Sequence, residues 1–250
     1  MALLKLDHLK NKYDLEISKI AHVGAHKGQE VDEYLNVFPD VMIHLFEPQV
    51  DLFEYLTKNF NNFNNISIHN YALGSKNGVS KMFISNNEGQ SSSFFEPKEH
   101  LNEHPEVKFE KGSAAYEIKI LDELKIVDID LLNIDTQGYE MEVLKGSRKL
   151  LSQNVKYIIL EVNKKELYEG CPLVKDIDIF LKKYGFIRTD THYWMDSYSW
   201  GDAFYIKKDL ISYKRQVFSA IKNNLYSISS LYYLLIQFRN IIWKVGRQTS

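Results

Sequence analysis

The sequence has a single cysteine, Cys171, among its 250 residues. One cysteine can form neither an intramolecular disulfide nor a cysteine-based zinc cluster, and this fits a reducing compartment. Charged side chains interrupt residues 1–16 too often to leave the apolar core of a signal peptide. We therefore expect a cytoplasmic protein.

Long apolar runs and an excess of charge of one sign are missing as well. The longest uncharged stretch, residues 223–238, contains Asn, Ser and Gln and is too short to span a bilayer, which takes about 20 apolar residues. The formal net charge of −2 gives no general attraction to polyanions, so we expect no nucleic-acid partner. Contact with a membrane surface stays open.

The hydrophobic fraction of 44% and the aromatic fraction of 13% are enough for a sizeable core. The length suits one α/β domain with an appendage, and we place the domain at residues 1–209, N-terminal helix included, and a helical tail at 210–250. Apolar runs alternate with helical patterns, which predicts a mostly parallel twisted sheet with right-handed crossovers and an antiparallel edge strand. The expected strands are 20–23, 42–46, 66–71, 131–134 and 157–162, with 186–189 and 203–206 closing one edge, and the expected helices are 30–37, 50–60, 140–151 and 174–184.

Three segments carry the candidate chemistry. In AHVGAHKGQE, Gly24 and Gly28 let the backbone approach a ligand at a helix N-terminus, although a turn without a ligand has the same form. His26 replaces the middle glycine of a dinucleotide fingerprint and disfavours nicotinamide. Glu47 follows the next strand, where a carboxylate can bind ribose hydroxyls or sit in a solvated turn. Asp135 ends a buried strand, as a ligand-facing acid or a helix cap.

A long segment, residues 85–112, contains Gly89, three serines at 91–93 and two prolines. Loops of this length in compact domains are usually functional, so we expect it to cross the active face.

In their order along the chain, the blocks VGAHKGQE, FEP, NYALG, SSSF, LDEL, NIDTQGYEMEVLKGS and ILEV resemble the FkbM-type methyltransferases. The resemblance spans about residues 20–208 and implies a Rossmann-like class I methyltransferase fold, S-adenosylmethionine as cofactor, and O-methylation of a sugar in a glycan or glycoconjugate. It departs at His22, where the family often has Asp, and at Thr136 and Gln137, where it often has Val-Glu. The implied cofactor-binding residues are Gly24, His26, Gly28, Glu47, Ala72, Ser92 and Asp135.

Methyl transfer requires alignment of the acceptor oxygen and removal of its proton. Asp135, Glu161 and His192 are the candidate catalytic residues, with His26 nearby, and a divalent metal held by oxygen ligands is an alternative that the sequence does not decide. Aromatic side chains between the last two strands suit a sugar ring or simply cover the sheet edge. They are Tyr193, Trp194, Tyr198 and Trp200, with Asp196 and Asp202 between them.

Two other functions compete with methyl transfer. A non-catalytic scaffold in glycan assembly would keep the fold, and the change at His22 is its only support. A nicotinamide-dependent oxidoreductase lacks its middle glycine.

The tail after Leu210 predicts a long helix with one apolar stripe and a charge of +6, against −8 for the rest of the chain. Such a stripe must be covered by the domain, by a second copy or by an anionic membrane at the inner face. We expect a homo-oligomer in which this helix takes part. The stripe comprises Val217, Ile221, Leu225, Ile228, Tyr232, Leu235, Phe238, Ile242 and Val245.

Overall fold

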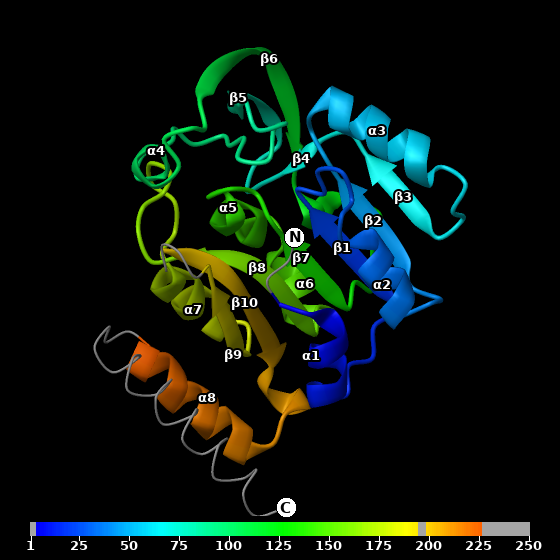
Figure 1. Cartoon of the computed structure of the whole chain (residues 1–250). Coiled ribbons are helices and arrows are strands. Elements are labelled where there is room, and N and C mark those ends of the chain that lie inside the picture. The colour runs from blue at the N-terminus through cyan, green and yellow to red at the C-terminus, as the bar shows by residue number, and fades with distance from the viewer. Residues whose placement is uncertain (1–3, 195–198, 227–250) are drawn as a thin grey trace, which may run out of the picture.

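The computed structural model describes residues 4–194 and 199–226 (Figure 1). Its central sheet consists of β1 (Lys19–Val23), β2 (Met42–Phe46), β3 (Ile66–His69), β7 (Leu131–Ile134), β8 (Tyr157–Asn163), β9 (Phe186–Tyr193) and β10 (Trp200–Lys207). The strand order is β3-β2-β1-β7-β8-β10-β9. The strands from β3 to β8 pair in parallel, and β10 runs antiparallel to both of its neighbours. The predicted α/β sheet is confirmed, with the antiparallel strand one place in from the edge strand β9.

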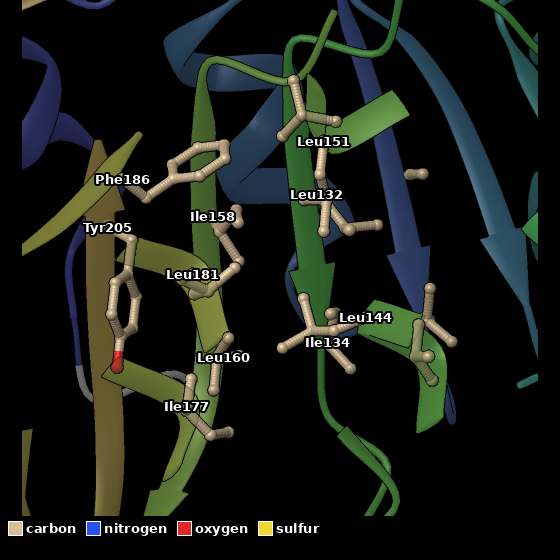
Figure 2. Packing of buried hydrophobic residues seen from close by; sticks show 14 of the residues in the cluster. Leu132, Ile134, Leu144, Leu151, Ile158, Leu160, Ile177, Leu181, Phe186 and Tyr205 are labelled. Carbon is tan, nitrogen blue, oxygen red and sulfur yellow. The ribbon is translucent and has the colours of Figure 1, made fainter. Parts of the chain in front are cut away.

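Helices cover both faces of this sheet. On one face lie α1 (Leu6–Tyr13), α2 (Val31–Val37) and α3 (Val50–Phe60), and on the other α5 (Glu140–Lys145), α6 (Arg148–Gln153) and α7 (Val174–Lys182). Because side chains alternate along a strand, Ile20 of β1 packs with the first layer and Val23 with the second. Figure 2 shows the second layer, where Leu144 and Leu181 contact the sheet in one buried cluster.

The helix expected at 140–151 is interrupted. A Cβ on Gly146 would lie 2.0 Å from the carbonyl oxygen of Gly74, so a residue with a side chain cannot take this position without moving the backbone. A new helix then starts at Arg148, where the Asp122 carboxylate accepts the backbone N–H groups of Lys149 and Leu150 at 2.7 and 3.0 Å.

A second sheet, in the order β4-β6-β5, lies beside the first and was not predicted. It is formed by β4 (Ala72–Leu73), β5 (Gly78–Ser85) and β6 (Phe109–Lys119). The strand expected at 66–71 therefore ends at His69, before the chain enters the second sheet. The expected long loop contains the short helix α4 (His100–Glu103), and β6 starts within it.

The described part of the tail is α8 (Tyr213–Tyr226), which packs on β9. Its contacting side is polar: Ser219 is buried, and Asn223 donates to the carbonyl oxygen of Arg188 at 2.7 Å. Val217 and Ile221 of the predicted stripe are 39% and 53% exposed, so β9 does not cover it. The stripe members from Ile228 onward, and the side chain of Leu225, lie outside the described residues. Within residues 4–194 and 199–226, each helix is too short or too polar to cross a membrane.

Candidate functional site

A pocket of about 370 Å³ opens beside the ends of β1, β2, β7 and β8. These strands are parallel, so their carboxyl ends share the edge at which open α/β sheets bind ligands. Most of the predicted site residues line it, namely Gly24, His26, Glu47, Ala72, Ser92, Asp135 and Glu161. Gly28 and His192 are not among its lining residues.

Gly24 brings two strand ends into contact. It has φ +81°, and a Cβ there would lie 1.8 Å from the carbonyl oxygen of Asp135. Glycine therefore lets the loop after β1 lie directly on the chain that leaves β7. Gly28 also has a positive φ, but a Cβ there would meet the ring of Phe60 at 2.8 Å. The need for glycine at Gly28 thus comes from its positive φ and from packing against α3, and not from the pocket.

Glu47 is buried at the end of β2 and accepts two backbone hydrogen bonds. Its Oε2 accepts the N–H of His26, and its Oε1 accepts the N–H of Gln49, each at 2.9 Å. Burial nevertheless raises the pKa of Glu47 to about 7. Each carboxylate oxygen can accept a further hydrogen bond, so this side chain fits a ligand that presents a pair of hydroxyl groups.

The glycine loop is tied to the segment that crosses the pocket. Gln29 donates to Nδ1 of His26 at 2.8 Å, which leaves the proton of the neutral ring on Nε2, and Nε2 donates to the carbonyl oxygen of Glu88 at 2.9 Å. Lys27 forms an ion pair with the Glu88 carboxylate. These contacts hold the neighbouring residues Gly89, Gln90 and Ser91 along the pocket wall. The prediction that residues 85–112 cross this face is confirmed.

One amide joins the two predicted acids. Nε2 of Gln137 donates to Oδ1 of Asp135 at 2.8 Å and to Oε2 of Glu161 at 2.9 Å. Asp135 faces the open pocket, but the surrounding protein restricts its hydration and raises its pKa. Glu161 is 5% exposed. Burial first, and then the carboxylates of Asp135, Glu140 and Asp202, raise its pKa well above the ordinary value.

The backbone around Gln137 is strained and clamped. Gln137 has φ +53°, a region that non-glycine residues seldom occupy. Ser93 donates to its carbonyl oxygen at 2.6 Å, and the Tyr168 hydroxyl lies 3.0 Å from its Oε1 and 2.9 Å from the carbonyl oxygen of Ser91. Oε1 of the buried Glu140 accepts the N–H groups of Thr136 and Gly138 and so fixes the turn before α5. The amide is therefore oriented by several elements at once.

A buried triad at the pocket floor was not predicted. His22 and Asn133 are register partners on β1 and β7, and both line the pocket. Asn133 donates to the Tyr34 hydroxyl at 2.5 Å, and that hydroxyl lies 3.2 Å from Nδ1 of His22. Burial lowers the pKa of His22, so the ring is neutral at pH 7. The available signal was a polar residue at matching positions in two otherwise apolar strands.

The structure places one of the predicted aromatic residues at the pocket and another in the core. Trp200 lines the pocket and stacks on Trp194, with ring centroids 5.5 Å apart and ring planes at 7°. Tyr193 is buried in the core and offers no free face. Tyr198 and Asp196 lie outside the described residues.

His192 is exposed on β9. Its strand is separated from β8 by β10, and two strand spacings amount to about 10 Å. This distance from β8 explains why His192, unlike Glu161, does not reach the pocket wall. The structure therefore does not place His192 with the other two candidate catalytic residues.

The described residues contain no group of three or more His, Cys, Asp or Glu side chains placed to hold a metal ion, so we propose no metal ligands. The pocket does fit an adenosine-containing cofactor. Glu47 supplies acceptors for hydroxyls, and the loop at Gly24 exposes backbone. Asp135 supplies a carboxylate that suits a cationic group.

Comparison with known proteins identifies the family of this chain. The sequence profile described as the Methyltransferase FkbM domain matches residues 22–188. A curated relative, the 2-O-methyltransferase NoeI of Sinorhizobium fredii (strain NBRC 101917 / NGR234), is 29% identical over 171 residues, which are 64% of this chain and 70% of NoeI. The crystal structure of methyltransferase FkbM from Methylobacillus flagellatus KT superposes with a TM-score of 0.53 at 12% identity. That match covers 76% of this chain but 43% of the other, so the solved protein is much longer. The resemblance seen in the sequence is confirmed, and with it a class I methyltransferase fold and S-adenosylmethionine as the cofactor.

Proposed function

Because the chain belongs to the FkbM methyltransferase family, we propose that it transfers the methyl group of S-adenosylmethionine to a hydroxyl group of a sugar. The observation that carries the proposal is the pair Asp135 and Glu161, held by one amide at the ligand edge of the sheet. The similarity to a 2-O-methyltransferase supports oxygen as the acceptor atom. Trp200 supports a sugar, because its flat face suits the C–H side of a pyranose ring.

In this proposal Glu47 binds the ribose hydroxyls of the cofactor, and the backbone at Gly24 passes beside its amino-acid part. The cofactor supplies an electrophilic methyl group on its sulfonium. The protein then has to align the acceptor oxygen and accept its proton. Ala72 and Ser92 complete the wall on the cofactor side.

We assign the general base to Asp135. Glu161 is the more deeply buried of the two acids and has the more strongly raised pKa, so it keeps its proton to higher pH. Asp135 faces the open pocket and ionises first. A protonated Glu161 can then donate a hydrogen bond to the acceptor while Asp135 takes the proton.

Calorimetry and mass spectrometry test the proposal together. S-adenosylhomocysteine should bind the protein and should bind Glu47→Ala much more weakly, with Glu54→Ala, an exposed residue of α3, as the control. Incubation with S-adenosylmethionine and a panel of glycans should add the mass of a methyl group. Unchanged binding by a folded Glu47→Ala protein would contradict the ribose assignment.

For the tail we propose self-association, with contact to an anionic membrane as the alternative. The support is the exposed apolar side of α8, which includes Phe218 at 69% exposure. Light scattering should show an assembly for the full chain and a smaller species for a chain that ends near Asp209, the proposed end of the methyltransferase domain. A full chain that is monomeric and does not bind anionic vesicles would contradict both ideas.

A further inference from the structure

The charge of the pocket is one-sided. Six of its described lining residues are acids, and none is lysine or arginine. The nearby Lys27 is paired with Glu88 at the rim. The lining acids are Glu30, Glu47, Glu106, Asp135, Glu161 and Asp202.

These acids are spread over the whole pocket. Glu30 and Glu47 belong to the side formed by β1 and β2, whereas Glu161 and Asp202 belong to β8 and β10. Asp202 is the direct cross-strand partner of Glu161. Like charges in this position repel each other, and the carboxylates of Asp135 and Asp202 both act to keep Glu161 protonated.

Paired acids of this kind are stabilised when a positive group enters and destabilised when a negative group enters. S-adenosylmethionine carries a sulfonium, an ammonium and a carboxylate, a net single positive charge. Because Glu161 keeps its proton, the negative potential on the side of Trp200 comes from the Asp202 carboxylate. Any acceptor must approach through that field, which is stronger in a pocket than in bulk water.

We propose that the pocket selects by charge: it binds the cationic cofactor more tightly than its neutral product, and it accepts sugars that are neutral or carry an amine while excluding uronates and sugar phosphates. This inference rests on the proposed function. It names the substrate class at the same site, since no described lining residue could pair with a carboxylate or phosphate as lysine or arginine does.

Two cofactor analogues test the charge preference without turnover. Sinefungin has a carbon in place of the sulfur, and that carbon carries an amine where the methyl group of S-adenosylmethionine lies. S-adenosylhomocysteine is neutral at this place. In calorimetry on the full chain, sinefungin should bind more tightly by about tenfold. Asp202→Asn should reduce the ratio, and Glu54→Gln, an exposed acid outside the pocket, should preserve it. Equal affinity in the unmutated protein overturns the inference, whereas failure of both analogues to bind overturns the proposed function itself.

Matched acceptors test the second part of the proposal, the exclusion of negatively charged sugars. 4-Nitrophenyl glucoside and glucuronide differ only in the carboxylate, and a panel of such pairs is incubated with S-adenosylmethionine. The neutral member of each productive pair should be methylated at least about tenfold faster. Asp202→Asn should narrow that difference. A uronate or sugar phosphate methylated as fast as its neutral partner overturns the exclusion, and the analogue comparison decides the charge preference whatever the acceptor.

Discussion

Nδ1 of His22 lies 3.2 Å from the hydroxyl oxygen of Tyr34. The hydroxyl accepts a hydrogen bond from Asn133, so its own proton is free to go to Nδ1. A neutral histidine that accepts at Nδ1 carries its proton on Nε2. His22 is therefore a fixed hydrogen-bond donor beside the pocket, where an aspartate would be an acceptor.

Tyr34→Phe should destabilise the protein by about 1–3 kcal/mol, because it leaves buried polar groups of His22 and Asn133 without a partner. It should also weaken binding of S-adenosylhomocysteine, since the orientation of the His22 ring is lost. Urea unfolding and calorimetry measure the two effects.

The matched control for that variant is Tyr71→Phe. The Tyr71 hydroxyl lies 3.3 Å from Nδ1 of His69 in a half-buried pair outside the pocket lining. Its removal should cost less than about 1 kcal/mol and leave binding unchanged. Equal effects of the two variants would show that the His22 pair has no special role.

Gly24→Ala should cost roughly 4 kcal/mol or more, because the new Cβ would overlap the Asp135 carbonyl oxygen and φ is positive. Gly170→Ala is the control, with φ +75° and nothing within 4 Å of the added atom. Strain alone should cost it about 1–2 kcal/mol. Thermal unfolding compares the two. Equal losses would mean that strain, and not the contact between the strand ends, explains Gly24.

Affinity for S-adenosylhomocysteine should rise with pH up to about 7 and then level off. The pKa of Glu47 is raised from 4.5 to about 7 in the free protein, and the ribose hydroxyls need the ionised carboxylate. Below pH 7, binding must release a proton, so calorimetry in buffers of different ionisation enthalpy should detect its release.

The folding stability of the free protein changes with pH in the opposite direction to the affinity. Between pH 4.5 and 7 the folded state holds more protons on Glu47 than the unfolded state does, so the free protein loses stability from this group as pH rises.

Glu47→Gln should abolish the dependence of affinity on this ionisation. A wild-type affinity that is flat from pH 5.5 to about 8 would contradict the assignment.

Gln137→Met should lower the rate of methyl transfer and move its rise to higher pH. The hydrogen bond from the Gln137 amide lowers the pKa of Asp135, so its loss makes Asp135, the proposed base, ionise at higher pH. The pH–rate profile measures the shift, and Gln153→Met, exposed on α6, is the control. A slower enzyme with an unshifted profile would assign Gln137 a structural role alone.

The main sheet could be predicted because its buried strands are short apolar runs that end in Gly24, Glu47 and Asp135. Those strand ends also predicted most of the pocket, since parallel strands bring their carboxyl ends to one edge. The second sheet was missed because β5 is buried only at Met82 and Ser85 and lacks the continuous apolar pattern of a buried strand.

Contacts between distant elements were the harder part. The triad of His22, Tyr34 and Asn133 joins two strands and a helix, and the register that pairs His22 with Asn133 is not written in either segment alone. His192 was predicted near the pocket because it follows a β-type run. Its distance from the pocket depends on β10, which inserts between β8 and β9, and the segment around His192 does not show that insertion.

That insertion links the pocket to the order of synthesis. β9 leaves the ribosome before β10, yet among the described strands of the main sheet it pairs with β10 alone. Trp200 and Asp202, which line the proposed acceptor side of the pocket, lie on β10. A nascent chain can therefore assemble the proposed cofactor side of the pocket while the proposed acceptor side is still missing, and it gains Trp200 and Asp202 only once β10 has joined the sheet.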